Sequence, residues 1–175
     1  VRHILRYGGY TEGWATYVEF LSYSYEYSDQ RLAKALSCSA SYSLALYSLC
    51  DIGINYEGWS FKETKDFLKN YNITGDDICK NIYQTVTMNV VSLMMSSTEP
   101  ANYLQYYVGY LEITALKEKV QKQLGTDFNL KDFHKSFLTI GPADFKTLKN
   151  GYTPFTDKDN IVRVGNSSQS AQSIF

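Results

Sequence analysis

Two carboxylates near the start of the chain have the clearest potential for chemistry. Glu12 and Glu19 belong to the stretch YTEGWATYVE, which follows the glycine pair Gly8–Gly9 and reads as the start of a helix. Glu12 would lie in the first turn, where the positive helix end stabilises a carboxylate, and Gly13 would let another segment approach closely. Glu19, seven residues later, falls on the same helix face. The neighbouring side chains are expected to be core: Trp14, Tyr17, Phe20 and Leu21.

An acid among aromatic side chains needs a cation, a hydrogen-bond donor or a metal ion as its partner, because an unpaired buried carboxylate is costly. The alternative is that Glu12 is an ordinary exposed acid at the beginning of a helix. The residue types alone leave both interpretations open.

A tyrosine stripe is the second candidate. Tyr103, Tyr106, Tyr107 and Tyr110 recur at i, i+3, i+4 and i+7 on one expected helix, which Gly109 would allow to pack closely against another. Tyrosine hydroxyls can donate hydrogen bonds to an oxyanion in a buried site. The same spacing is also typical of core residues whose hydroxyls reach the rim.

His134 is the third candidate, on a helical face with Leu130, Phe137 and Leu138. A histidine on an apolar face is either a hydrogen-bonded core residue or a catalytic or metal-binding group. His3, near the start of the chain, is a weaker candidate.

Signals for helix starts and ends along the whole chain indicate which helices carry these candidate residues. No stretch alternates apolar and polar residues long enough to predict a convincing strand. The expected capping signals are Asp29, Ser60 with Glu63, Thr74 with Asp77, Pro100, Asn129, Gly141, Pro142 and Gly151. The expected helices span residues 11–27, 30–54, 61–71, 75–96, 100–125, 130–140 and 142–151. The second of these is rich in small residues and is expected to be central and packed on all sides.

The sequence therefore predicts an all-α multi-helix bundle with one domain over residues 1–155. Residues 156–175 are polar and rich in Ser and Asn, which predicts an extended tail. A length of 175 residues with 44% hydrophobic residues is sufficient for a single core.

The formal net charge of −1 gives no electrostatic case for nucleic acid or an anionic membrane as a partner. No apolar run reaches the roughly 20 residues of a membrane span. Cys38, Cys50 and Cys79 are expected to be small buried residues, because their odd number and spacing fit neither a disulfide framework nor a metal site. The chain begins at Val1 and runs almost directly into a helix, which indicates a piece of a longer protein.

Four motifs in order resemble a large bacterial family, domain-of-unknown-function family 885, whose members are similar to zinc metallopeptidases of the gluzincin and oligopeptidase type. YTEGWA resembles the family's "EGWA" motif, and DIGI followed by GWS resembles "D-x-G-I…GW-[ST]". YYVG resembles the "Y-x-I-G" helix, and FNLKDFH followed by glycine resembles "FDLRxFH…G". The similarity covers roughly residues 10–148.

The resemblance implies that this chain is the C-terminal part of a larger α-helical metallopeptidase-like fold. Glu12 would be the third zinc ligand, beside two histidines supplied by an earlier His-Glu…His motif. Two imidazoles, one carboxylate and an open position are a donor set typical of catalytic zinc. Tyr106 and His134 would be catalytic, donating to the oxyanion of a peptide substrate. Three further residues would either support the metal ligand and the catalytic side chains from outside or face the substrate: Glu19, Asp51 and Tyr107.

The chain departs from the family pattern at several points. It has no His-Glu…His motif, since its histidines are His3 and His134. Tyr47 stands where the family often has Arg, and Asn55 stands where it often has His. We therefore expect zinc to be bound in the intact parent rather than by this chain alone, which would be inactive without the N-terminal part.

The sequence favours part of a zinc-dependent peptidase that hydrolyses peptide bonds. The alternative is a non-catalytic helical module that binds a peptide along the tyrosine stripe or acts as a scaffold. A cell-envelope or secreted location of the parent stays open.

Overall fold

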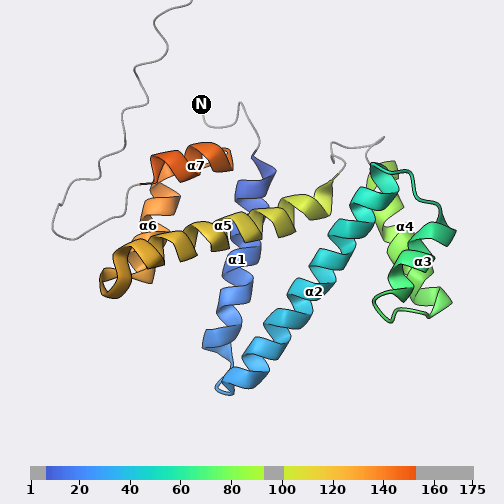
Figure 1. Cartoon of the computed structure of the whole chain (residues 1–175), viewed down its shortest axis with the longest axis horizontal. Helices are drawn as coiled ribbons and strands as arrows, with labels where there is room; N and C mark the ends of the chain where they lie inside the picture. Colours follow the sequence, from blue (N-terminus) through green and yellow to red (C-terminus); the bar gives the residue numbers. More distant parts are fainter. Residues whose placement is uncertain (1–6, 93–100, 153–175) are drawn as a thin grey trace, which may run out of the picture.

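The computed structural model describes residues 7–92 and 101–152, and this part of the chain is helical throughout, without strands (Figure 1). The predicted all-α multi-helix fold is confirmed. The predicted tail lies outside the described residues. The elements are α1 (Gly8–Glu26), α2 (Gln30–Asn55), α3 (Phe61–Lys69), α4 (Asp76–Ser92), α5 (Asn102–Leu124), the 3₁₀ helix η1 (Gly125–Asp127), α6 (Leu130–Ile140) and α7 (Phe145–Gly151).

Local capping sets the start of several helices as predicted. The Asp29 side chain accepts from the first backbone amides of α2, and Asn129 does the same for α6. These side chains satisfy amides that have no partner within the helix. The predicted closing residues Gly125 and Gly141 follow α5 and α6 with φ of 55° and 78°, a conformation that glycine adopts without strain.

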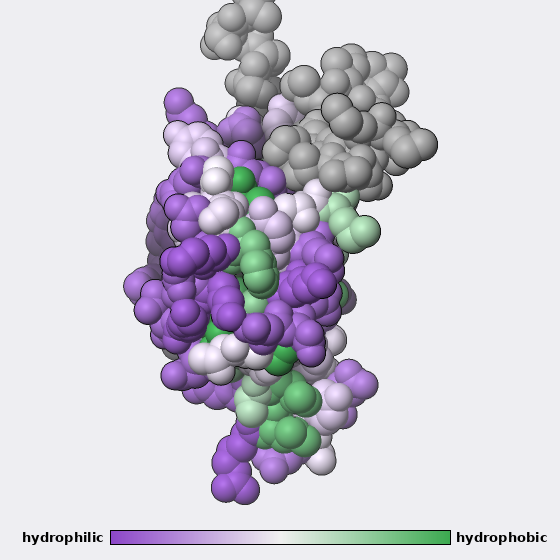
Figure 2. Space-filling model, turned by 90° about the vertical axis from the view of Figure 1, so that its right-hand side faces the viewer, coloured by the Kyte–Doolittle hydropathy of each residue, from purple (hydrophilic) through white to green (hydrophobic). Residues whose placement is uncertain are grey.

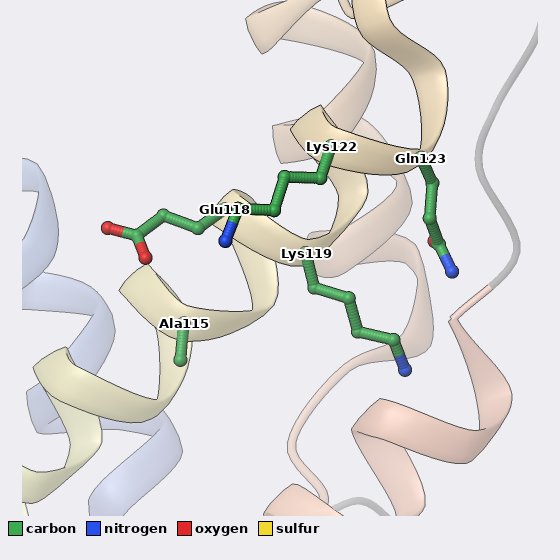
Figure 3. Close-up of a pocket in the computed structure, with 5 residues that line it drawn as sticks. All are labelled: Ala115, Glu118, Lys119, Lys122 and Gln123. Atoms are coloured by element: carbon green, nitrogen blue, oxygen red, sulfur yellow. The ribbon is translucent and has the colours of Figure 1, made fainter.

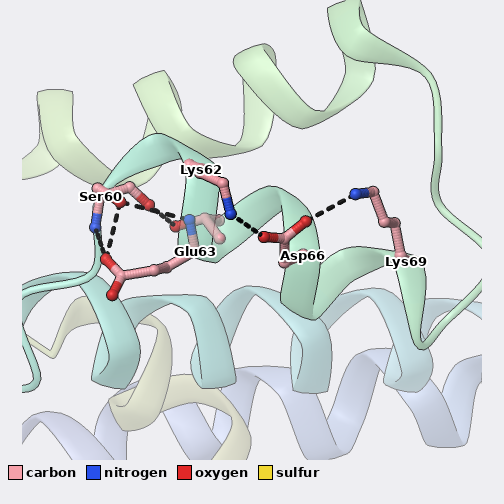
Figure 4. Close-up of polar contacts among 6 residues, drawn as sticks. Ser60, Lys62, Glu63, Asp66 and Lys69 are labelled. Atoms are coloured by element: carbon pink, nitrogen blue, oxygen red, sulfur yellow. Dashed lines mark hydrogen bonds and ion pairs between the residues drawn. The ribbon is translucent and has the colours of Figure 1, made fainter.

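The start of α3 is held by the capping box predicted from Ser60 and Glu63 (Figure 4). The backbone N–H of Ser60 donates to the Glu63 carboxylate at 2.8 Å, while the Ser60 hydroxyl accepts from the Glu63 amide. Further along the helix, Lys62 and Lys69 both donate to Asp66. These two hydrogen bonds lower the pKa of Asp66 to about 2.

Four helix starts differ from the predictions. α5 begins at Asn102, after Ala101, rather than at the predicted Pro100, which lies outside the described residues. α1 begins at Gly8 rather than residue 11, so Glu12 lies in its second turn and the helix end does not stabilise it. α4 begins at Asp76, and the amide of Cys79 donates to the Gly75 carbonyl, so Thr74 is not the capping residue. α7 begins at Phe145, and its cap is Asp144 rather than a proline.

The helices pack into two apolar clusters. The first joins α1, α5, α6 and α7, and its buried members are Tyr10, Tyr17, Ile113, Leu116, Val120, Phe133, Phe137 and Leu148. The second joins α2, α3 and α4, and its buried members are Leu46, Cys50, Leu68, Cys79, Ile82 and Val86. The long helix α2 connects the clusters and meets the first turn of α5 (Figure 1).

The prediction that the small-residue helix is packed on all sides is wrong. Few residues of α2 are buried, namely Ala33, Leu46, Ser48, Cys50, Asp51 and Gly53. Before Leu46, the residues of α2 other than Ala33 are partly or fully exposed. Cys50 and Cys79 are buried as predicted, but Cys38 on α2 is exposed.

The α3–α4 end of the molecule faces the viewer in Figure 2, where hydrophilic side chains flank a narrow hydrophobic band. Among the described residues, no helix has the length and apolar character needed to cross a membrane.

Candidate functional site

The candidate site lies where α5 crosses α1 (Figure 1), and glycines on both helices make the crossing close. A Cβ atom built on Gly109 would lie 2.8 Å from the Cα atom of Gly13 and would overlap the Gly9 carbonyl oxygen. A Cβ built on Gly13 would lie 2.5 Å from the Cα atom of Gly109. The two backbones therefore touch directly, which is the close approach predicted from Gly13 and Gly109.

This crossing brings Glu12 and Tyr106 together. Glu12 precedes Gly13 on α1, and Tyr106 lies one turn before Gly109 on α5. Both side chains are half-buried, and the Glu12 carboxylate lies close enough to the phenol of Tyr106 to affect its pKa. Burial raises the pKa of Tyr106, and the charge of Glu12 raises it further. The phenol therefore stays protonated and can act as a hydrogen-bond donor near the Glu12 carboxylate.

The tyrosine stripe divides between the two clusters. Tyr103 packs against Tyr47 at a ring-centroid distance of 5.0 Å, at the second cluster, which joins α2, α3 and α4. Tyr110 makes an edge-to-face contact with Phe20 at 4.9 Å, beside the first cluster, which joins α1, α5, α6 and α7. The core interpretation therefore holds for both ends of the stripe. Tyr107 is half-buried, with its ring 6.3 Å from that of Tyr110.

His134 lies on the other side of α1. Its Nε2 atom is 3.0 Å from the hydroxyl of buried Tyr17, and its ring meets Trp14 edge-on at 5.3 Å. Residues in an α-helix are about 100° apart, so Trp14 and Tyr17 point about 200° and about 140° away from Glu12. His134 therefore contacts a different face of α1 from the one that carries Glu12. Burial, and then the charge of Lys117, lower the pKa of His134.

Glu19 and Asp51 have separate environments. Glu19 is exposed and accepts a hydrogen bond from the Tyr23 hydroxyl at 3.1 Å. Asp51 is buried on α2, with only 3% of its surface exposed. Its carboxylate accepts from the side-chain amide of Asn55 at 2.6 Å and from the backbone amide of Tyr103 at 3.2 Å.

The DIGI…GWS segment has a visible structural role. A Cβ on Gly53 would overlap the ring of Trp59, whose backbone amide donates to the Gly53 carbonyl at 2.8 Å. The ring therefore lies directly on α2 and turns the chain into α3. Sequence reasoning did not anticipate the contacts of Ser48 and Asp51 with α5, although Ser48, Asp51 and Asn55 share a face at i, i+3 and i+7.

A zinc ion does not fit the donors of this chain alone. Within residues 7–92 and 101–152, no three or more His, Cys, Asp or Glu side chains lie close enough together to hold a metal ion. Glu12 offers one carboxylate, and His134, the histidine in this part of the chain, contacts α1 on a different face. Two further ligands would have to come from outside the described residues.

A surface hollow of about 380 Å³ on α5 does not coincide with the candidate site (Figure 3). Its lining side chains all project from one helix and include none of the predicted site residues: Ala115, Glu118, Lys119, Lys122 and Gln123.

Comparison with known proteins gives one family. The model of a family described as bacterial protein of unknown function (DUF885) matches residues 1–150. No curated protein matches the chain, and no solved structure matches it.

Proposed function

The chain belongs to the bacterial family of unknown function DUF885, and from this premise we propose that it is the C-terminal part of a zinc-dependent, metallopeptidase-like protein that hydrolyses peptide bonds. In this proposal, Glu12 is the metal ligand that the chain contributes, and Tyr106 beside it donates a hydrogen bond to the oxyanion of the substrate. The remaining ligands and the catalytic base come from the N-terminal part of the parent.

The observation that carries the proposal is the proximity of Glu12 and Tyr106 at the glycine crossing. The two residues are 94 positions apart and come from two separate motifs, EGWA and YYVG. A carboxylate has two oxygens and several lone pairs, so Glu12 can interact with the nearby phenol of Tyr106 and still bind a cation. The packing of α1 on α5 fixes the pair before any ligand arrives, which is the property expected of a preorganised site.

Tyr106 suits the role of a donor to an oxyanion. Its raised pKa keeps the phenol protonated at neutral and moderately alkaline pH. It is half-buried, so a substrate carbonyl near it would be partly shielded from water. We assign no catalytic step to His134, because its ring is packed between Trp14 and Tyr17.

The non-catalytic alternative requires a peptide groove along the tyrosine stripe. Tyr103 and Tyr110 pack against the two clusters, so the continuous stripe that this alternative uses is interrupted at both ends. No contact of the described residues favours it over the peptidase.

The proposal is tested by Glu12→Gln in the intact parent protein, with bound zinc and turnover of a peptide library as readouts. We expect loss of both with little change in the fold, because an amide keeps the size but loses the charge and is a poorer zinc ligand. Glu19→Gln should matter much less, since Glu19 is exposed and lies about 10 Å further along the helix. Glu26→Gln, at the exposed end of α1, is the control. Full zinc and full activity in Glu12→Gln would refute the assignment.

A further inference from the structure

The first turn of α5 has no side-chain cap from Ala101, the described residue that precedes it. Ala101 precedes the helix with a left-handed φ of 69°, and its side chain has no hydrogen-bonding group. The first amides of a helix need acceptors from elsewhere, because no residue within the helix can reach them. Among the described residues, acceptors for the first amides of α5 come from another element.

Helix α2 supplies those groups on both sides of Tyr103. The Asp51 carboxylate accepts from the Tyr103 amide at 3.2 Å, and the Ser48 hydroxyl lies within hydrogen-bond distance of the Tyr103 carbonyl, at 3.0 Å. Asn55 donates to the other Asp51 oxygen at 2.6 Å and orients the carboxylate. The ring of Tyr47 packs at a tilt of 34° against that of Tyr103. One residue of α5 is thus held through its amide, its carbonyl and its side chain.

The clamped residue lies one helical turn before Tyr106. A helix is stiff over one turn, so the position and rotation of Tyr103 determine where the Tyr106 side chain points. The other anchor of this segment is the contact of Gly109 with α1, one turn beyond Tyr106. Tyr106 therefore lies midway between two fixed points, and the first of them depends on Asp51.

We propose that Asp51 is a positioning residue, which holds the first turn of α5 so that the Tyr106 side chain stays beside Glu12. Asp51 acts through the backbone of Tyr103, and a carboxylate with both oxygens occupied inside the protein is not on the substrate side. The geometric part of this inference stands on the contacts above. Its consequence for catalysis rests on the proposed function.

The test in this chain compares Asp51→Ala, Asp51→Asn and a control, Ile82→Val. Ile82 is buried in the cluster of α2, α3 and α4, and its side chain carries no hydrogen-bonding group. Its truncation therefore lowers stability without removing a hydrogen bond from the start of α5. The readouts are hydrogen exchange of the amides of residues 103–107 and the pKa of the Tyr106 phenol, both by NMR. Amides of α6 serve as an internal reference for the stability of the rest of the chain.

We expect Asp51→Ala to accelerate exchange at residues 103–107 by about tenfold or more relative to Ile82→Val, because a hydrogen bond to a charged group is lost. The Tyr106 pKa should fall toward its ordinary value of 10 as the phenol leaves Glu12. Asp51→Asn keeps one acceptor oxygen and should give a smaller change in both readouts. A purely structural Asp51 would lower stability and leave the Tyr106 pKa unchanged.

The inference is overturned if Asp51→Ala behaves like Ile82→Val in both readouts. If Asp51→Ala does not fold, the Asp51→Asn variant provides the test. Amide exchange at residues 103–107 of Asp51→Asn that is no faster than in Ile82→Val would contradict the inference. In the intact parent, Asp51→Ala should lower kcat and add little to the effect of Tyr106→Phe. If Tyr106→Phe and Glu12→Gln leave the parent fully active, the proposed function fails, while changed exchange and pKa would still establish the positioning role.

Discussion

Replacing Gly109 by Ala tests whether the crossing of α1 and α5 is as close as described. The added Cβ would lie 2.8 Å from the Cα atom of Gly13, whereas ordinary contact needs 3.4–4 Å, and it would overlap the Gly9 carbonyl oxygen. Both obstacles are backbone atoms, so no side chain can rotate away and one helix has to move. Overpacking of this kind costs up to about 3 kcal/mol. The better helix propensity of Ala returns about 1 kcal/mol.

The expected net loss for Gly109→Ala is therefore about 2 kcal/mol, or a fall in Tm of about 4–8 °C for a chain of this size. Urea and thermal unfolding followed by far-UV circular dichroism measure it. Gly151→Ala is the matched control, because open space surrounds that glycine, and its effect should stay within about 0.5 kcal/mol. A Gly109→Ala protein as stable as the wild type would refute the description of the crossing and the placement of Glu12 beside Tyr106.

Three further predictions concern the chain by itself. Calorimetric titration should show weak or no zinc binding, because Glu12 is without the imidazole partners of a zinc site, and stoichiometric submicromolar binding would contradict this. The lowered pKa of His134 means that the unfolded chain binds this proton more tightly, so stability should be full above pH 6.5 and fall as the pH drops below it. His134→Gln should flatten that dependence in unfolding measured between about pH 5 and 8, and an unchanged slope would contradict the assignment. A thiol reagent should modify the exposed Cys38 quickly but reach Cys50 and Cys79 only after unfolding, because both are buried. Burial also raises the pKa of the Cys50 thiol to about 11. Fast modification of all three cysteines would show that the cluster of α2, α3 and α4 is loosely packed.

The parts of the fold that local chemistry determines could be predicted from the sequence. Asp29, Ser60 with Glu63, and Asn129 each bond amides two or three residues away, so three residues of sequence contain the whole signal. The same holds for Gly141, whose φ of 78° closes α6. These signals require no knowledge of tertiary packing.

The sequence-based predictions are wrong where residues far apart in the sequence determine the local structure. Gly8 and Gly9 looked like a flexible pair before a helix, yet they lie inside α1, because Gln105 of α5 and Phe145 of α7 lie directly against them. Glycines that permit a close crossing cannot be distinguished by sequence from glycines that end a helix. The small residues of α2 predicted close packing on every side, and only packing in three dimensions shows that much of this helix is exposed.

The candidate site was predicted in part. Sequence motifs identified Glu12 and Tyr106, but periodicity could not show that they meet, since they lie on helices separated by α2, α3 and α4. His134 was expected beside them, and the face of α1 that α6 covers places it with Tyr17 instead. The roles of these residues in catalysis stay predictions.

The most direct test of the central claim, that Tyr106 and Glu12 form part of a peptidase site, is the turnover of the Tyr106→Phe variant of the intact parent. Tyr110→Phe is the control, because Tyr110 uses its ring in the core contact with Phe20 and Phe preserves that ring. Losing one donor to an oxyanion lowers kcat by about 10²–10³. We predict a loss of this size for Tyr106→Phe, with zinc content retained and Tyr110→Phe close to wild type. Wild-type kcat in Tyr106→Phe, or equal losses in both variants, would contradict the claim.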